Sequence, residues 1–135
     1  MVSYAPPGGS VGAHVDSYDV FLVQGRGTRT WSVEGSPRAA DDEALRPALD
    51  VRILDRYNPD ATWELGPGDA LYIPPRYAHH GVSTSAECLT YSVGFRAPSA
   101  AELLTSFAQY AAVNVLTEDM RYSDADIPQL ATPSP

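Results

Sequence analysis

Two short histidine-containing stretches carry the residue types in this sequence that could do chemistry. His14 and Asp16 are separated by one residue, and His79 and His80 are the other two histidines of the 135-residue chain. Two imidazoles and one carboxylate on one side of a metal ion leave its other positions open, as in non-haem iron(II) oxygenases. The sequence therefore predicts a metal site built from His14, Asp16 and one histidine of the 79–80 pair.

The spacing within each stretch limits how the site can be built. If residues 14–23 form a β-strand, His14 and Asp16 point to the same face, about 7 Å apart along the strand. The same alternation allows only one of His79 and His80 to face an interior, and spacing alone leaves open which one. A His-x-Asp triplet or a histidine pair is usually unrelated to metal binding, so the hypothesis depends on their occurring together.

Short β-rich segments separated by glycine and proline turns must position these residues. We expect strands at residues 2–5, 14–23, 29–33, 51–56, 62–65, 70–73, 79–84 and 88–95, and a surface excursion over residues 34–50. Eight short strands with frequent turns are typical of an all-β jelly roll or small barrel.

The residue pattern changes after residue 97, and a helix is expected over residues 100–116. Ser99 is placed as its N-cap and Glu102 completes a capping box. Leu103, Leu104, Phe107 and Tyr110 recur at helical spacing and form an apolar stripe, which favours association of two copies into a homodimer. Residues 121–135 contain three prolines and are interpreted as a tail or linker.

Composition places the chain among soluble globular proteins, with 44% hydrophobic and 19% charged residues. No apolar run is long enough to span a membrane, and a single cysteine, Cys88, makes a cytoplasmic location the default. The net charge of −8 argues against direct nucleic-acid binding, although it could attract a basic polypeptide. All nine basic residues are arginines, so any fixed cation at a site must be an arginine.

Four stretches in order resemble one known family. They are residues 7–16 (PGGSVGAHVD), 18–25 (YDVFLVQG), 66–75 (GPGDALYIPP) and 91–98 (YSVGFRAP). Together they resemble the cupin-like JmjC-domain ribosomal oxygenases, most closely the bacterial branch that hydroxylates an arginine of a large-subunit ribosomal protein. The resemblance runs from residue 1 to about residue 127. It implies a double-stranded β-helix over residues 1–97 that binds Fe(II) and 2-oxoglutarate, with residues 98–120 as the start of a dimerisation region.

The resemblance also implies roles for particular residues. The family pattern Pro-Pro-x-x-x-His selects His79 as the third metal ligand, beside His14 and Asp16. The family anchors 2-oxoglutarate with a basic residue two positions before a tryptophan, which here is Arg29 before Trp31; a guanidinium can clamp a carboxylate with two hydrogen bonds. Arg26 is expected to be solvated. Tyr18 and Asp19 are candidates for orienting the site, with a structural role favoured, and core packing is expected for Tyr4, Tyr91 and Ser92.

The expected function is therefore that of a 2-oxoglutarate-dependent dioxygenase that hydroxylates a side chain of a basic ribosomal protein. One alternative is another metal-binding cupin enzyme, although those usually present His-x-His and a nearby glutamate. A second is a truncated, non-catalytic binding barrel. The family's enzymes carry sequence before the barrel and further helical and winged-helix-like regions after it, so we expect a fragment of a longer enzyme or a natural minimal version.

Overall fold

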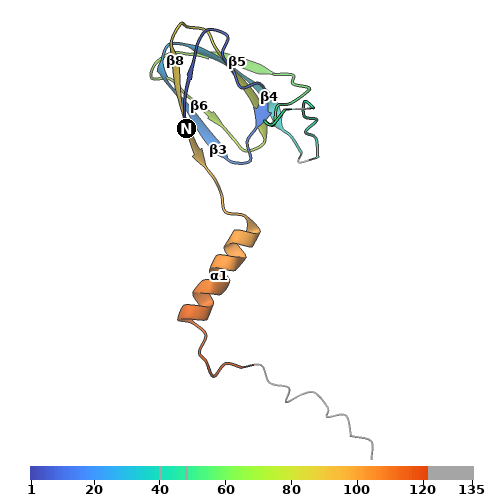
Figure 1. Cartoon of the computed structure of the whole chain (residues 1–135), viewed down its shortest axis with the longest axis vertical. Coiled ribbons are helices and arrows are strands. Elements are labelled where there is room, and N and C mark those ends of the chain that lie inside the picture. Colours follow the sequence, from blue (N-terminus) through green and yellow to red (C-terminus); the bar gives the residue numbers. More distant parts are fainter. Residues whose placement is uncertain (40, 48, 122–135) are drawn as a thin grey trace, which may run out of the picture. The chain divides into compact units, whose positions relative to one another are not determined.

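The computed structural model describes residues 1–39, 41–47 and 49–121, in two compact units, residues 1–97 and residues from 98 onward. Within the described residues the first unit contains eight strands and the second contains one helix, α1 (Figure 1). The expected tail lies, beyond Arg121, outside the described residues.

The strands form two four-stranded antiparallel sheets that face each other as a barrel. One sheet has the order β1-β8-β3-β6 and the other β2-β7-β4-β5. The strands are β1 (Val2–Ala5), β2 (His14–Val15), β3 (Asp19–Arg26), β4 (Arg29–Pro37), β5 (Ala61–Leu65), β6 (Ala70–Ile73), β7 (Tyr77–Ser83) and β8 (Cys88–Phe95). The expected all-β jelly-roll barrel followed by a C-terminal helix is confirmed.

Alternation along the strands fills the barrel. On β3 and β4 every second side chain points inward, so Val20 and Leu22 meet Trp31 and Val33 in one buried cluster, which Leu65 and Ile73 complete. Removing a large apolar side chain of this kind from water is worth roughly 1.5–3 kcal/mol. This cluster of apolar side chains therefore holds the two sheets together.

Two strand predictions are wrong. Residues 14–23 form two strands that belong to different sheets, because β2 pairs with β7 and β3 pairs with β6 and β8. Residues 51–56 form no strand; Leu54 makes only an isolated bridge to Leu45. Leu54 is nevertheless buried, in a small cluster with Ala13 and Ala78 on the side of β7 away from the first cluster. Leu54 is therefore apolar because it packs in this cluster, and not because it belongs to a paired strand.

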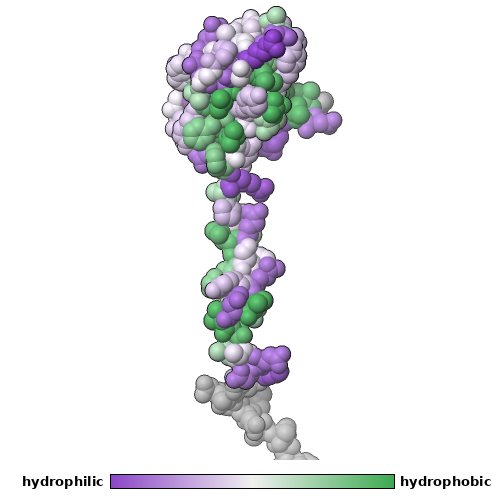
Figure 2. Space-filling model, turned by 90° about the vertical axis from the view of Figure 1, so that its left-hand side faces the viewer, coloured by the Kyte–Doolittle hydropathy of each residue, from purple (hydrophilic) through white to green (hydrophobic). Residues whose placement is uncertain are grey.

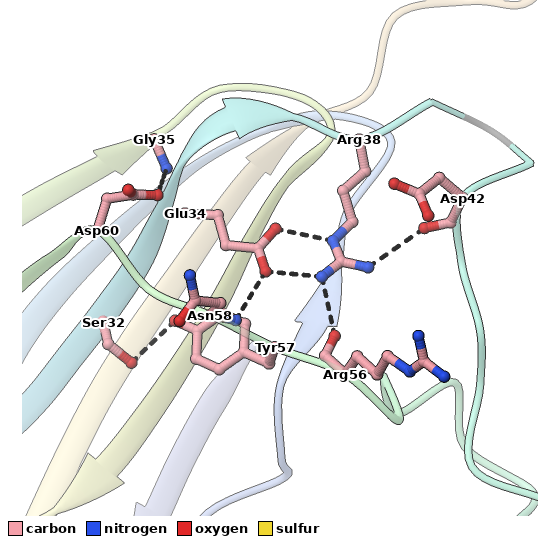
Figure 3. Close-up of polar contacts among 9 residues, drawn as sticks. All are labelled: Ser32, Glu34, Gly35, Arg38, Asp42, Arg56, Tyr57, Asn58 and Asp60. Carbon is pink, nitrogen blue, oxygen red and sulfur yellow. Dashed lines mark hydrogen bonds and ion pairs between the residues drawn. The ribbon is translucent and has the colours of Figure 1, made fainter.

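Polar contacts fasten the excursion between β4 and β5 (Figure 3). The Glu34 carboxylate accepts two hydrogen bonds from the Arg38 guanidinium, at 2.8 and 2.6 Å, and a third from the backbone of Asn58 at 3.0 Å. Arg38 also donates to the carbonyl oxygens of Asp42 and Arg56. The bidentate pair, little exposed at either end, ties both ends of the excursion to β4.

The outer face of the first sheet carries aromatic side chains. Tyr4 and Tyr91, expected in the core, are 63% and 43% exposed and point outward, which corrects that expectation. Phe21, Tyr72 and Phe95 share this face and contact one another through their rings. Figure 2 shows apolar residues gathered on the visible face of the barrel unit.

The helix α1 spans Ala100–Asn114, with Val115 as its C-cap, two residues shorter than expected. The capping box is present: Ser99 Oγ accepts from the Glu102 amide at 3.1 Å, and the Glu102 carboxylate accepts from the Ser99 amide at 2.7 Å. No side chain of α1 is buried, and association through its apolar stripe stays a prediction. None of the described helical structure is long and apolar enough to cross a membrane.

Gly81 allows Trp31 to lie flat against β7. An added Cβ at Gly81 would lie 2.6–2.8 Å from three carbon atoms of the Trp31 ring, which is itself 4% exposed. Gly81→Ala should therefore destabilise the chain by about 1–3 kcal/mol through overpacking. Urea denaturation measures this, with Gly66→Ala as the control, because its Cβ would meet nothing closer than 3.8 Å. Equal unfolding midpoints for both variants would contradict the prediction.

Candidate metal centre

The pairing of β2 with β7 brings two histidines together from opposite halves of the sequence. His14 and His79 are direct partners in the antiparallel register, and their ring centroids lie 4.3 Å apart. Directly opposed residues of antiparallel strands have neighbouring side chains on one face. This pairing fixes two imidazoles side by side at one end of the barrel.

Asp16 joins them from the residue just after β2. Its carboxylate oxygen Oδ2 lies 3.7 Å from His79 Nε2, and one ligand atom from each of His14, Asp16 and His79 lies within 4.8 Å of the others. The Arg76 amide donates to the Asp16 carbonyl oxygen at 2.8 Å. Arg76 adopts a positive φ of 73° after Pro74-Pro75, so a constrained corner holds the backbone of Asp16 in place.

Hydrogen bonds orient both imidazoles. Nδ1 of His14 lies 3.0 Å from the Gly12 carbonyl oxygen, and Nδ1 of His79 lies 3.0 Å from the Tyr77 carbonyl oxygen. A carbonyl oxygen can only accept, so each Nδ1 carries the proton and each Nε2 keeps its lone pair. Backbone carbonyls commonly fix metal-binding histidines in this way. The three side chains thus present two nitrogen donors and one carboxylate.

Burial keeps His79 neutral. The residue is 1% exposed, and burial, the largest effect, lowers the pKa of His79; the hydrogen bond to Tyr77 opposes it, the nearby His14 adds to it, and Asp16 opposes it least. Burial also lowers the pKa of His80. A neutral imidazole is the form that binds a metal ion.

The same shifts predict that the metal-free chain loses stability as the pH falls. Both pKa values are lower in the folded than in the unfolded chain, so below about pH 6.5 the unfolded chain binds more protons and is favoured. Urea midpoints measured with a chelator at pH 7.5, 6.5 and 5.5 should decrease in that order. His79→Gln should reduce the slope, and midpoints that rise on acidification would contradict the assignment.

His80 faces the other side of β7. Its Nε2 lies 2.7 Å from Ser10 Oγ, and its ring meets Tyr57 edge to face at 6.1 Å. Ser10 Oγ also accepts from the Gly12 amide at 3.0 Å, which fixes the hydroxyl beside His80. The structure thus brings His79 to the cluster and places His80 outside it.

A cavity of about 330 Å³ opens beside the three side chains. Its walls also include Tyr18, Val20, Leu22, Trp31, Ser92, Gly94 and Arg96. Burial, and then the charge of Asp16 and a hydrogen bond to it, raise the pKa of Tyr18, so this hydroxyl stays protonated beside the carboxylate. Asp19 instead lies outside the cavity and accepts a hydrogen bond from Tyr72 at 2.5 Å.

Arg29 lies deeper in the barrel, on the inner face of β4. On β4 and β7, Val33 pairs with His79 and Arg29 pairs with Ser83. The Arg29–Ser83 pair is therefore four residues, about 13 Å, along the strands from the Val33–His79 pair. Arg29 is 6% exposed, and no ion pair joins it to an acidic side chain in the part of the chain that the structure describes. A buried cation without a carboxylate partner is costly unless an anion binds beside it. Arg26, by contrast, pairs with Glu87 at the surface, as expected.

Several residues at the site were missed from the sequence. Ser92 was assigned to packing, and Val20, Leu22, Gly94 and Arg96 were not considered as cavity walls. The period-two alternation of β3 and β8 was the available signal, because Val20 pairs with Gly94 and Leu22 with Ser92. Arg76 carried no sequence signal beyond following two prolines.

Comparisons with known proteins agree with this geometry. A family model for the JmjC domain matches residues 1–103. Ribosomal protein uL16 3-hydroxylase of Escherichia coli is 42% identical over 134 residues, covering 99% of this chain. A probable ribosomal oxygenase of Haemophilus influenzae is 48% identical over 110 residues, covering 81% of this chain. The structure of the E. coli ribosomal oxygenase YcfD in complex with cobalt and 2-oxoglutarate superposes with a TM-score of 0.71, at 39% identity over 99% of this chain.

The matched relatives are much longer than this chain. It covers 35% of the E. coli hydroxylase, 26% of the H. influenzae protein and 33% of the YcfD chain solved with cobalt. The similarity therefore concerns about a third of each relative, and the JmjC family match over residues 1–103 spans the three residues of the cluster described above.

Proposed function

Because this chain belongs to the JmjC-domain family, we propose that it carries the catalytic barrel of an iron(II)- and 2-oxoglutarate-dependent oxygenase that hydroxylates a protein side chain. The observation that carries the proposal is the convergence of His14, Asp16 and His79 at a cavity, with ligand atoms within 4.8 Å of one another. Two imidazole nitrogens and a carboxylate are the donor set that suits a non-haem Fe(II) with open positions.

The residues present fit both the metal and its co-substrate. His14, Asp16 and His79 would hold Fe(II), and Arg29 would pair with the distal carboxylate of 2-oxoglutarate. The support for Arg29 is its burial without an acidic partner among the described residues, about four residues along the barrel from His79. When bound, Fe(II) would activate O₂ with two electrons supplied by 2-oxoglutarate, which becomes succinate and carbon dioxide; one oxygen atom of O₂ enters succinate and the other enters an unactivated C–H bond.

The chain's own residues orient these groups and exclude water. The carbonyl oxygens of Gly12 and Tyr77 keep the two Nε2 atoms directed at the metal. Burial, and then the charge of Asp16, raise the pKa of the Tyr18 hydroxyl, which stays protonated and available as a donor to the Asp16 carboxylate. Val20, Leu22 and Trp31 line the cavity with apolar surface, which would limit water near the reacting atoms.

The substrate we propose is an arginine side chain of a large-subunit ribosomal protein. The support is the similarity to a ribosomal protein uL16 3-hydroxylase, together with a net charge of −8 that suits a basic partner. Ribosomal proteins are made and assembled in the cytoplasm of bacteria, so a cytoplasmic location follows from this substrate.

The experiment measures turnover and substrate together. The purified chain is incubated with Fe(II), ascorbate, 2-oxoglutarate and large-subunit ribosomal proteins. We expect succinate to form and one ribosomal protein to gain the mass of one oxygen atom on an arginine. Omitting 2-oxoglutarate and adding a chelator are the controls.

Each failure has a distinct meaning. Oxidation without 2-oxoglutarate would favour another cupin dioxygenase. Metal binding without turnover, together with capture of a ribosomal protein, would favour the non-catalytic binding barrel.

A further inference from the structure

The end of the barrel interior beyond Trp31 is polar and largely buried. Five side chains form this polar end, each 6% exposed or less: Gln24, Arg29, Ser83, Cys88 and Thr90. They come from four strands, and the register places Arg29 opposite Ser83 and Gln24 opposite Thr90. Buried polar groups persist where they hydrogen-bond one another, so these contacts indicate what the group does.

The sulfur of Cys88 lies at the centre of the polar end. It accepts a hydrogen bond from Arg29 Nε at 3.4 Å and another from Gln24 Nε2 at 3.3 Å. Gln24 is itself fixed, because its Oε1 accepts from Thr90 at 2.9 Å and its Nε2 shares its two protons among Cys88 and the Arg26 and Gly27 carbonyl oxygens. Arg29 therefore donates to a sulfur acceptor whose position is fixed by the β3–β4 turn and by β8.

The groups around the Cys88 thiol also suit its role as a hydrogen-bond acceptor. Burial alone would raise the pKa of Cys88, but hydrogen bonds from Gln24, Arg29 and Ser83 and the charge of Arg29 outweigh it and lower the pKa. Arg29 is the charged group among these contacts, and the others are neutral. The sulfur thus lies beside a buried cation that has no carboxylate partner among the described residues.

We propose that Cys88 is a positioning residue for Arg29: its sulfur holds the guanidinium by Nε and leaves the two terminal nitrogens for the distal carboxylate of the co-substrate. A guanidinium binds a carboxylate best as a planar fork, so fixing its plane favours bidentate pairing. This inference rests on the proposed function, because it assigns a supporting residue to the same co-substrate. The alternative is that Cys88 only fills space in the core, as buried cysteines often do.

The test compares ligands that do and do not reach Arg29. Calorimetry on the Mn(II)-loaded chain measures the affinity for 2-oxoglutarate and for oxalate, which has the metal-chelating half of the co-substrate and no distal carboxylate. Cys88→Ala removes the acceptor, Cys88→Ser keeps one, and Ile73→Val is the control for loosening the core, because Ile73 is 1% exposed and lies on β6.

We expect Cys88→Ala to weaken 2-oxoglutarate binding by roughly tenfold and to leave oxalate binding within about twofold. Cys88→Ser should recover most of the loss, and Ile73→Val should bind both ligands like the wild type. Equal affinity of Cys88→Ala and wild type for 2-oxoglutarate, or parallel weakening by Ile73→Val, would show that Cys88 only packs.

A second measurement needs neither metal nor co-substrate. Cys88 is the only cysteine, so a carbon-labelled cysteine gives one resonance whose titration by nuclear magnetic resonance reports the thiol pKa. Arg29→Met should raise this pKa, and an unchanged titration would refute the contact. If wild type binds no 2-oxoglutarate, the proposed function fails and Cys88 loses the anchoring role with it. If wild type binds and Cys88→Ala binds equally, only the inference about Cys88 fails.

Discussion

Replacing His79 with alanine should abolish binding of Fe(II), or of Mn(II) as an inert substitute, whereas His80→Ala should bind one metal ion per chain. His79 is buried, with Nε2 3.7 Å from the Asp16 carboxylate and its proton held on Nδ1 by the Tyr77 carbonyl oxygen. His80 directs its Nε2 to Ser10 on the other side of β7. Since loss of an outer hydrogen bond to a ligand already costs 10–100-fold in affinity, loss of the ligand should exceed about 100-fold.

The pair of variants is matched, because the residues are adjacent on one strand and lose the same imidazole. Calorimetry at pH 7.5 gives the affinity and the number of ions bound, and circular dichroism checks that both variants fold. Equal loss in the two variants, or loss only in His80→Ala, would overturn the choice of ligand.

The residue types of this site could be predicted from the sequence, whereas their arrangement in space could be predicted only in part. Residue types and spacing predicted a site with His14, Asp16 and one later histidine, but alternation on β7 only shows that His79 and His80 face opposite ways. Which of them faces inward depends on the register of β7 against β2 and β4, and neither neighbour is close in the sequence. The family pattern supplied that choice.

The errors in the strand predictions have physical causes. Residues 14–23 have continuous β propensity, yet the chain crosses from one sheet to the other between Val15 and Asp19, where propensity carries no signal. Tyr4 and Tyr91 lie on correctly predicted strands but on the outer face, because the alternation does not state which face is buried. Val51, Ile53 and Leu54 suggested a strand, although Leu54 is buried in a loop.

The hydrogen bonds of the polar end that contains Arg29 could not be predicted from the sequence, for a different reason. Arg29 bonds to Cys88, Cys88 to Gln24 and Gln24 to Thr90 only because β3, β4 and β8 converge at one end of the barrel, across sequence separations of up to 66 residues. Each residue alone is compatible with ordinary packing. Their common role emerges from burial and from the direction of each hydrogen bond.

Arg29→Ala should weaken 2-oxoglutarate binding by about 2–5 kcal/mol and leave the metal affinity nearly unchanged. The guanidinium would pair with the far carboxylate, some four residues along the barrel from His79, and it contacts none of the metal-binding side chains. The loss is large because the carboxylate would then be buried without a partner. Calorimetry on the Mn(II)-loaded variant measures it directly.

Arg26→Ala provides the matched control for Arg29→Ala. Arg26 lies three residues before Arg29, but its side chain is 67% exposed and pairs with Glu87 at the surface, where removing a charge has little effect on a buried ligand. Its affinity for 2-oxoglutarate should stay within about twofold of wild type. An impaired Arg26→Ala beside an unaltered Arg29→Ala would move the anchor to the β3–β4 turn. Loss of metal binding in Arg29→Ala would instead mean that Arg29 supports the barrel as a whole, because no direct contact links it to the three ligands.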